Sequence, residues 1–271
     1  MKVTKLKLIL GLLGILQFGC VQPVLELEEA SKEDKILSKS LLNQPITVQQ
    51  RNLSGYQMYQ TVDRVLPKIR TASYEVCRDL ELEKCEIMLS VNADIISWNQ
   101  EINAFANQND EIYIYGGLIN SLNSDAEIAA VLAHEFVHVM FGHVEAKINN
   151  AMLGGLLVGG LVAIYSDNND VYDPQAIEDA ENLGMEIGSL VYSKEMEIEA
   201  DRASVYILVK AGYFPYAAVN TIVRINNITP QNTFGPRIAF LETHPTDVDR
   251  VAYLLKVIED AQAGIPLQLR R

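Results

Sequence analysis

The stretch VLAHEFVHVMFGH, residues 131–143, constrains this chain more than any other part, because it holds three of the four histidines. The acidic and apolar residues from Asp125 onward predict that the stretch lies on a helix. Successive helical residues turn by about 100°, so His134 and His138 lie about 40° apart and one turn apart along the axis. Both imidazoles can therefore bind one Zn²⁺, and Glu135 can hold a water on that ion and take its proton.

The third histidine of the stretch, His143, lies nine residues after His134. A continuing helix would turn it about 180° away from the metal. We therefore interpret His143 as a packing residue or as a side chain that contacts a ligand, unless Gly142 breaks the helix and redirects it. The stretch then supplies two metal ligands, and the third must come from elsewhere.

An acidic segment further along the chain, YSKEMEIEADRAS at 192–204, offers that third ligand, since an acidic residue is a common third ligand of catalytic zinc. Helical spacing pairs Glu195 with Glu199, and Glu197 with Asp201. Spacing alone does not choose between these pairs. A solvated acidic face would explain the charges, but not their placement among apolar residues.

Five motifs in this order, NAFA, IYIYGGLI, HEFVH, EIEAD and HPTDVDR, resemble the M48 zinc metalloendopeptidases, in particular their periplasmic lipoprotein members. The resemblance covers Asn103 to Arg250 and implies one Zn²⁺ per chain. It also implies that Glu197 is the third zinc ligand and that Asp201 supports a ligand histidine through a hydrogen bond.

The fourth histidine, His244, matches the HPxxxxR element of that family together with Pro245 and Arg250. A zinc peptidase needs a donor or cation for the developing oxyanion. We expect His244 either to play that role or to cap the open metal position at rest, and Arg250 to act as an orienting charge. The alternative is a turn before a helix, which Pro245 and Thr246 would start in any case.

Apolar patterns predict a mainly helical α+β fold with a small sheet or hairpin beside the helix of His134. The family resemblance implies that this is a zincin-like metalloprotease domain. Strands are expected at 86–91 and 111–119, and a hairpin with its turn at Asn107–Asp110. Main-chain pairing accepts many sequences, so we expect one hairpin strand to pair with an extended substrate. That strand consists of Asn103, Ala104, Phe105 and Ala106.

Helices are expected at Gly55–Leu80 with a kink at Pro67, after Ser124 or Asp125, three times between 175 and 228, and from Thr246, with Asp249 in a cap-like position. The apolar segment 151–165 covers about 22 Å as a helix, against a hydrocarbon core of about 30 Å. We interpret it as a buried or hinge-like helical hairpin beside the site, or a lid. Membrane contact is the alternative.

The N-terminus predicts an export signal, with a basic start and an apolar run from Leu8 to Leu16. Cys20 follows in a position that resembles the lipobox of bacterial lipoproteins, although the two positions before Gly19 lack the usual Leu and small residue. By resemblance, Val21 in place of Asp implies the outer membrane rather than the inner one. We expect a lipoprotein signal peptide at 1–19, an N-terminal tether at 20–50 and an M48-like zinc metalloprotease domain at 51–271, in the bacterial periplasm.

The net charge of −13 argues against nucleic acid as a partner. With Cys20 assigned to a lipid anchor in the membrane, Cys77 and Cys85 remain as a pair in an oxidising compartment. This predicts a disulfide. Two separate buried thiols are the alternative.

Together these features predict a zinc-dependent endopeptidase, in which Glu135 activates water and returns the proton to the leaving amine. The resemblance implies quality control of unfolded, misfolded or misassembled cell-envelope proteins. One alternative is a chaperone or assembly factor for outer-membrane proteins with little or no proteolysis. Glu135 favours the enzyme, because a binding module would not need it. Another alternative is an integral-membrane peptidase that uses residues 151–165.

Overall fold

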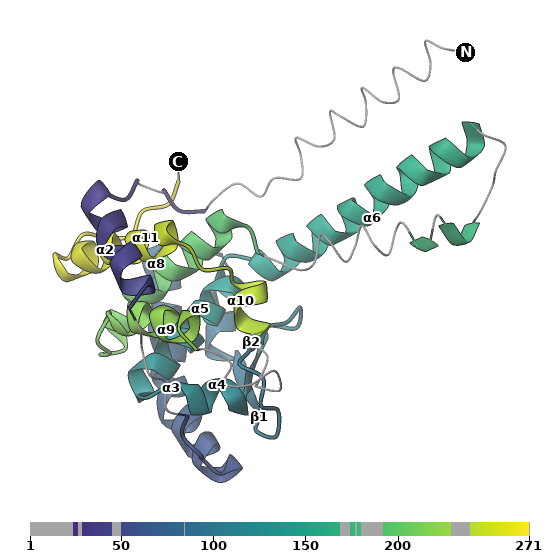
Figure 1. Ribbon diagram of the computed structural model, residues 1–271. Coiled ribbons are helices and arrows are strands. Elements are labelled where there is room, and N and C mark those ends of the chain that lie inside the picture. The colour runs from purple at the N-terminus through teal and green to yellow at the C-terminus, as the bar shows by residue number, and fades with distance from the viewer. Residues whose placement is uncertain are drawn as a thin grey trace. The chain divides into compact units, whose positions relative to one another are not determined.

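The computed structural model describes residues 24–26, 29–44, 50–83, 85–168, 174–176, 178–179, 192–228 and 239–270 (Figure 1). The chain divides into two compact units, one formed by Pro23–Val144 with Tyr192–Arg271 and the other by Met1–Gln22 with Glu145–Val191. The first unit carries every residue of the candidate site. The predicted signal peptide, Cys20 and most of the region expected to hold a helix after 175 lie outside the described residues.

The core of the first unit is built around α5 (Asp125–Met140), in which all but the end residues are buried. A helix that is buried all round needs other elements on each of its faces. Here these are α3 (Gly55–Asp79), α8 (Lys194–Lys210) and α9 (Ala217–Asn226), as Figure 1 shows. The side chain of Ser124 caps α5 by accepting from the Glu127 N–H, as predicted.

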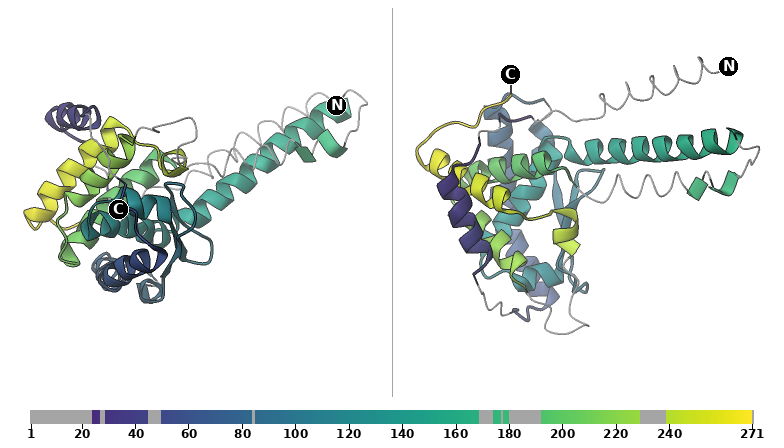
Figure 2. Two further views of the ribbon diagram at one scale, coloured as in Figure 1. Left: turned by 60° about the horizontal axis from the view of Figure 1, so that its bottom comes forward. Right: turned by 45° about the horizontal axis from the view of Figure 1, so that its top comes forward.

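A second layer consists of α2 (Lys32–Leu42) and α11 (Val248–Gln262), which pack against each other, with α11 also on α8 (Figure 2). Lys35 forms an ion pair with Asp249 at 3.2 Å. The α2 part of the segment expected as a tether therefore belongs to the compact unit. The cap of α11 is Asp247, not Thr246, because the Asp247 side chain accepts from the first-turn N–H of Arg250.

A mixed three-stranded sheet has the order β1 (Asn92–Ile96), β3 (Glu111–Tyr115), β2 (Ala104–Ala106), with β1 parallel and β2 antiparallel to β3. Both β2 and β3 contact α5. This confirms the predicted α+β class and the hairpin beside the histidine-bearing helix. The hairpin turn includes Asp110, whose φ is 59°.

The strand predicted at 86–91 is wrong. The chain forms the 3₁₀ helix η1 (Cys85–Leu89) there, and β1 begins only after it. Cys85, Met88 and Val91 are the buried residues, three apart in sequence. This spacing places Cys85 and Met88 on one face of η1, with Val91 following directly after it, whereas a strand would alternate every second residue.

The strand predicted at 111–119 ends early, because α4 (Gly116–Ser121) begins directly after Tyr115. A Cβ on Gly117 would lie 2.1 Å from the carbonyl oxygen of Gln100, so the neighbouring backbone passes too close for any side chain. Gly116 and Gly117 therefore mark a place where two chain segments cross closely, and they do not continue the strand.

The apolar segment 151–165 lies within one continuous helix, α6 (His143–Asn168). The predicted helical hairpin is therefore wrong, because the glycines lower helix propensity without breaking the hydrogen-bonded run. Among the described residues, no helix combines the length and the apolar character needed to cross a membrane.

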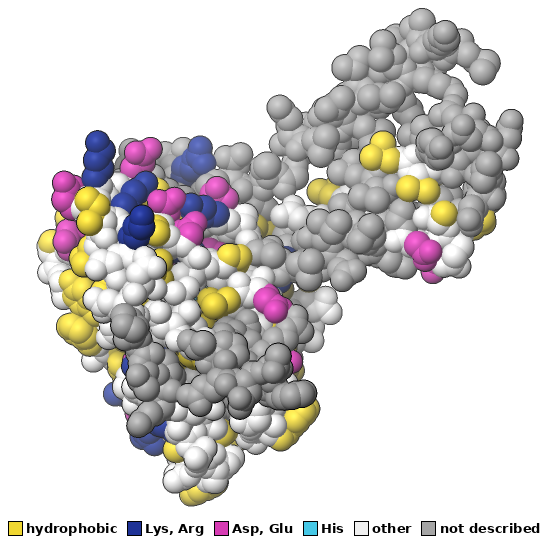
Figure 3. Space-filling view, viewed as in Figure 1, with side chains coloured by type: hydrophobic (Ala, Val, Ile, Leu, Met, Phe, Trp, Pro, Cys, Tyr) yellow, Lys and Arg dark blue, Asp and Glu magenta, His cyan; other side chains and the backbone are white. Residues whose placement is uncertain are grey.

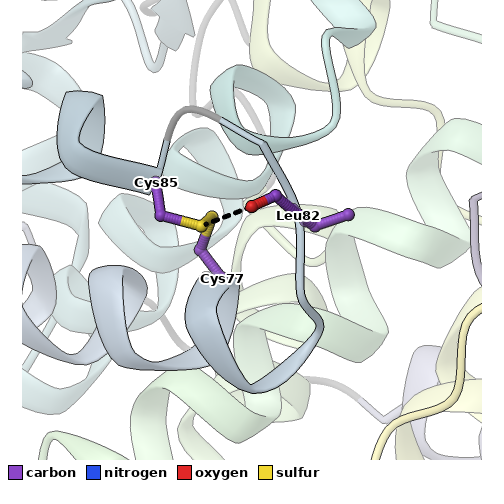
Figure 4. Close-up of a disulfide and its surroundings, with 3 residues drawn as sticks. All are labelled: Cys77, Leu82 and Cys85. Atoms are coloured by element: carbon purple, nitrogen blue, oxygen red, sulfur yellow. Dashed lines mark hydrogen bonds between the residues drawn. A yellow bond between two sulfur atoms is a disulfide. The ribbon is translucent and has the colours of Figure 1, made fainter.

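Cys77 at the end of α3 forms a disulfide with Cys85 at the start of η1, with Cα atoms 5.6 Å apart (Figure 4). Both residues are buried.

Where α2 and α11 meet the solvent, Lys and Arg side chains lie among Asp and Glu (Figure 3). Here Lys194 forms ion pairs with Asp247 and Asp249, so this surface carries mixed charge.

Candidate metal centre

Four buried side chains from three parts of the chain converge beside α5. Their ligating atoms all lie within 4.8 Å of one another, and they belong to His134, His138, Glu197 and His244. His134 Nε2 lies 3.0 Å from His138 Nε2 and 3.3 Å from His244 Nδ1. Glu197 Oε1 lies 2.9 Å from His244 Nδ1. The two predicted helix ligands thus meet the predicted acidic ligand at one point.

The donor set fits Zn²⁺, which takes imidazole nitrogens and carboxylate oxygens in fours. The Nδ1 of His134 faces Asp201 Oδ1 at 3.0 Å, so that nitrogen carries the proton and Nε2 has a free lone pair. The Nε2 of His138 faces the same point. A cation between these two nitrogens, which lie 3.0 Å apart, would accept a lone pair from each ring.

The structure separates two glutamates that helical spacing left equivalent. Glu197 is 1% exposed and contacts the histidines, whereas Glu195 is exposed in the first turn of α8. Ser193 caps α8 by accepting from the Met196 N–H. Burial would raise the pKa of Glu197, yet the charges of His244 and Arg250 hold it well below its usual range.

Asp201 and Arg250 form a buried pair behind the ligands. Arg250 donates from Nε and Nη2 to the two Asp201 oxygens at 2.8 Å each, and its Nη1 lies 2.8 Å from Glu197 Oε2. Burial lowers the pKa of His134, but its hydrogen bonds to Asp201 and Glu197 outweigh this and raise it to about 10, so this ring favours a positive charge that a cation on Nε2 would supply in place of the second proton. Arg250, predicted as an orienting charge, therefore neutralises and orients two carboxylates.

Glu135, predicted as the general base, is fully buried beside the ligand cluster. In the part of the chain that the structure describes, neither of its oxygens has a hydrogen-bond partner. Glu135 Oε1 lies 3.5 Å from His244 Nε2. A buried carboxylate without hydrogen bonds is costly, which is typical of a site that awaits a ligand or water.

His143 does not face away from the site, as a continuing helix would require. The helix α5 ends at Met140, Gly142 adopts a φ of 67°, and α6 starts at His143. The left-handed glycine redirects the chain, so that His143 Nδ1 lies 3.0 Å from His138 Nδ1. His143 therefore contacts a candidate ligand rather than the metal position.

Two aromatic residues of the site had no signal in the sequence. Tyr192 stacks on the ring of His138 with centroids 3.9 Å apart, and Phe240 stacks on His244 at 4.5 Å. Phe240 lies in the short helix α10 (Ala239–Thr243), which was not predicted. Both lie far from the HExxH stretch in sequence, so only the tertiary structure reveals these contacts.

The predicted substrate-pairing strand, β2, is an edge strand of the sheet. Asn103 accepts a hydrogen bond from Tyr115 N, and Asn107 N donates to Glu111. Since antiparallel pairing alternates, the backbone groups of Ala104 and Ala106 point away from β3, but both residues are buried, with Ala104 0% and Ala106 6% exposed. Phe105 stacks on Tyr113 at 5.3 Å.

A histidine pair and a glutamate on one buried helix, with a carboxylate from a second helix, define the metal centre of a zincin-like metallopeptidase domain. The chain belongs to peptidase family M48, whose family model matches residues 76–258. The match includes all four converging residues and confirms the family resemblance seen in the sequence motifs.

Several curated proteins are similar to this chain. Metalloprotease LoiP of Escherichia coli K12 is 26% identical over 161 residues, 57% of this chain and 58% of that protein. Mitochondrial metalloendopeptidase OMA1 of Arabidopsis thaliana is 29% identical over 162 residues, 59% and 30% of the two chains. The beta-barrel assembly-enhancing protease of Escherichia coli K12 is 26% identical over 156 residues, 57% and 32%. The chain thus spans from under a third to almost three fifths of these relatives.

Proposed function

We propose that this protein is a zinc-dependent endopeptidase that acts on extended segments of unfolded or misassembled proteins. The observation that carries the proposal is Glu135, a buried carboxylate free of hydrogen bonds within the described chain and directly beside the converging ligands. A structural role would give such a group a partner. A general base instead needs free oxygens near the reacting atoms.

His134, His138 and Glu197 would hold the metal. When bound, Zn²⁺ polarises the peptide carbonyl and lowers the pKa of water towards about 7. Glu135 then accepts the proton of the attacking water and delivers it to the leaving amine. Asp201 keeps the His134 tautomer fixed by accepting from its Nδ1–H at 3.0 Å.

The edge position of β2 supports binding of substrate in an extended conformation. The backbone groups of Ala104 and Ala106 that point away from β3 can add a strand to the sheet once the chain that buries them moves aside, and such pairing tolerates many sequences. Because β2 packs against α5, an added strand would run close to Glu135. Unfolded chains expose segments of this kind, whereas folded proteins do not.

His244 is proposed to cap the metal position at rest, since its Nδ1 lies within the ligand cluster. If His244 held the metal together with His134, His138 and Glu197, no position would be left for water, so His244 would have to leave for turnover. We expect His244→Ala to raise the initial rate of casein hydrolysis about 10- to 1,000-fold. This range is the inverse of the fraction of molecules in a minor open state, in which His244 has left the metal position. A rate that falls instead would assign His244 to oxyanion stabilisation. The double variant with Glu135→Gln is the control and should stay inactive.

Misfolded or misassembled cell-envelope proteins are the proposed clients, as part of quality control. The support is the name of one relative, the beta-barrel assembly-enhancing protease, which joins assembly with proteolysis. The same name supports a second candidate function, an assembly factor with little proteolysis. If a Glu135→Gln variant fully restored β-barrel assembly in a deletion strain, this second function would be favoured.

We also propose that the protein is a periplasmic lipoprotein, anchored through Cys20, and that the outer membrane is its site. The support is the order of basic start, apolar run and cysteine. Cys20→Ala should move the protein from the membrane fraction to the soluble periplasmic fraction and abolish labelling with radioactive palmitate. An unchanged membrane fraction would contradict the lipid anchor.

A further inference from the structure

Glu199 is a buried carboxylate on α8, between Glu197 and Asp201 in sequence, that the proposed mechanism does not use. We propose that Glu199, acting through His143, is a positioning residue for the candidate ligand His138. The backbone of the N-terminal segment 24–26 holds Glu199 in place. The inference deepens the proposed function and rests on His138 being a metal ligand.

The contacts form a continuous chain of buried groups. His138 Nδ1 lies 3.0 Å from His143 Nδ1, and His143 Nε2 lies 3.3 Å from Glu199 Oε2. The second Glu199 oxygen, Oε1, accepts from the backbone N–H of Leu25 at 2.5 Å. His138, His143 and Leu25 have no exposed surface, and Glu199 is 1% exposed. Water therefore does not compete for these contacts.

The chain of contacts fixes one tautomer at each ring. The 3.3 Å contact with Glu199 does not meet the geometry of a hydrogen bond, but a carboxylate oxygen this close favours a proton on the His143 Nε2 over Nδ1, which leaves the His143 Nδ1 lone pair as an acceptor. His138 then donates from Nδ1–H to that lone pair. This leaves the lone pair of His138 Nε2 directed at the metal position, where it lies 3.0 Å from His134 Nε2. A ligand histidine needs this arrangement to bind a cation.

Helix α8 thus supplies one carboxylate for each histidine ligand. Asp201 reaches His134 directly, with 3.0 Å between Oδ1 and Nδ1. Glu199 reaches His138 through one intervening imidazole. The left-handed conformation of Gly142 makes this possible, because it turns His143 back towards α5.

Segment 24–26 is itself fixed on both sides. Its Val24 carbonyl accepts from Arg270 N at 2.8 Å, and its Glu26 N–H donates to Gln268 O at 3.1 Å. Arg202 of α8 donates to the Glu26 carbonyl at 2.7 Å. The Leu25 N–H is therefore a rigid donor, and it determines which Glu199 oxygen remains for His143.

Zinc affinity of the folded chain, measured by competition with a chromophoric chelator, tests the inference. In Glu199→Gln, the Leu25 N–H retains the acceptor oxygen, so the amide N–H faces His143 Nε2 and favours the wrong tautomer. We expect the affinity to fall about 10- to 100-fold, the usual effect of losing such a partner. The visible spectrum of the Co²⁺-loaded protein should change as well. Glu195→Gln, at an exposed position of the same helix, should leave both unchanged.

A double variant separates action through His143 from a general structural effect. His143→Asn keeps an acceptor near His138 but is too short to reach Glu199. In that background, Glu199→Gln should change the affinity by less than about twofold, because the two residues act as one unit. An equal loss in both backgrounds, or no loss in the wild-type background, would overturn the proposal. Circular dichroism checks that each variant is folded.

The outcomes distinguish this inference from the proposed function. If the wild-type chain binds no zinc and cleaves nothing, the proposed function fails. If it binds zinc and cleaves casein while Glu199→Gln keeps the wild-type affinity, only the role of Glu199 fails.

The N-terminal part of the inference has its own test. Leu25→Pro removes the N–H, whereas Leu25→Ala keeps it and truncates the buried side chain. We expect Leu25→Pro to lower zinc affinity as Glu199→Gln does, and Leu25→Ala to retain it. Equal losses in both would show that the segment acts through packing, and would overturn the role of its backbone.

Discussion

Glu135→Gln is expected to reduce casein hydrolysis about 10²- to 10⁴-fold, the usual contribution of a positioned general base. The amide has nearly the shape of the carboxylate but cannot take a proton from water. Among the candidate ligands, Glu135 approaches His244, with 3.5 Å between Glu135 Oε1 and His244 Nε2. The variant should therefore keep one zinc per chain, which metal analysis of the same sample would show. Equal hydrolysis by wild type and variant would refute the mechanism.

Two variants on α8 serve as the matched pair for that experiment. Glu197→Ala should lose both zinc and activity, because it removes a buried carboxylate from the ligand cluster. Glu195→Ala should keep both, since Glu195 is exposed. The opposite pattern, with zinc lost only in Glu195→Ala, would show that the ligand assignment is wrong.

Arg250→Met is expected to lower the free energy of unfolding of the metal-free protein by about 3–5 kcal/mol. Arg250 is 2% exposed and neutralises two buried carboxylates, Asp201 and Glu197, at 2.8 Å. Without it, both charges would be buried with too little compensation. Urea unfolding at neutral pH measures the effect. Adding zinc should recover part of the loss, because the cation replaces one of the missing charge partners.

The control for this experiment is Lys194→Met. Lys194 also contacts two carboxylates, those of Asp247 and Asp249, but its side chain is 44% exposed. Exposed ion pairs contribute about 0–1 kcal/mol because water and salt screen them. Similar small losses in both variants would show that the buried pair does not stabilise the fold.

The effect of Arg250→Met should also depend on pH. In the wild type, Arg250 helps hold the pKa of Asp201 and of Glu197 below their usual values, against the effect of burial. This stabilisation is present above the unfolded values of about 3.9 and 4.3 and is lost as the pH falls through the lowered ones. In the variant, burial favours the protonated carboxyls. The difference between the two proteins should therefore shrink as the pH falls towards 4.

The sequence predicted well what depends on local spacing. His134, Glu135 and His138 meet on one side of α5 because helical phase is set by the backbone alone. The end of α3 and the hairpin turn follow from capping and turn chemistry in the same way. The strand predicted at 86–91 failed because a short apolar run fits more than one periodicity, and burial selected η1.

Other features were decided by a single backbone angle or by distant packing. The φ of Gly142 brings His143 back to His138, although the sequence allowed either outcome. Arg250 was expected as an orienting charge, but its partners Asp201 and Glu197 lie 49 and 53 residues away in sequence. That pairing follows from the packing of α11 on α8.

The sequence by itself determined the helix that carries the HExxH motif, because this is recorded in residue spacing along one element, and it indicated the family through several motifs in order. Glu135 as the general base stays a prediction. Residue spacing left Glu195 and Glu197 equivalent, and only the family resemblance pointed to Glu197 and His244. The tertiary structure shows that both lie in the ligand cluster, and it alone revealed that Glu199 reaches His143. The physical reason is burial. Which acidic side chain loses its water depends on what packs over α8, and the elements that do so lie far apart in the chain.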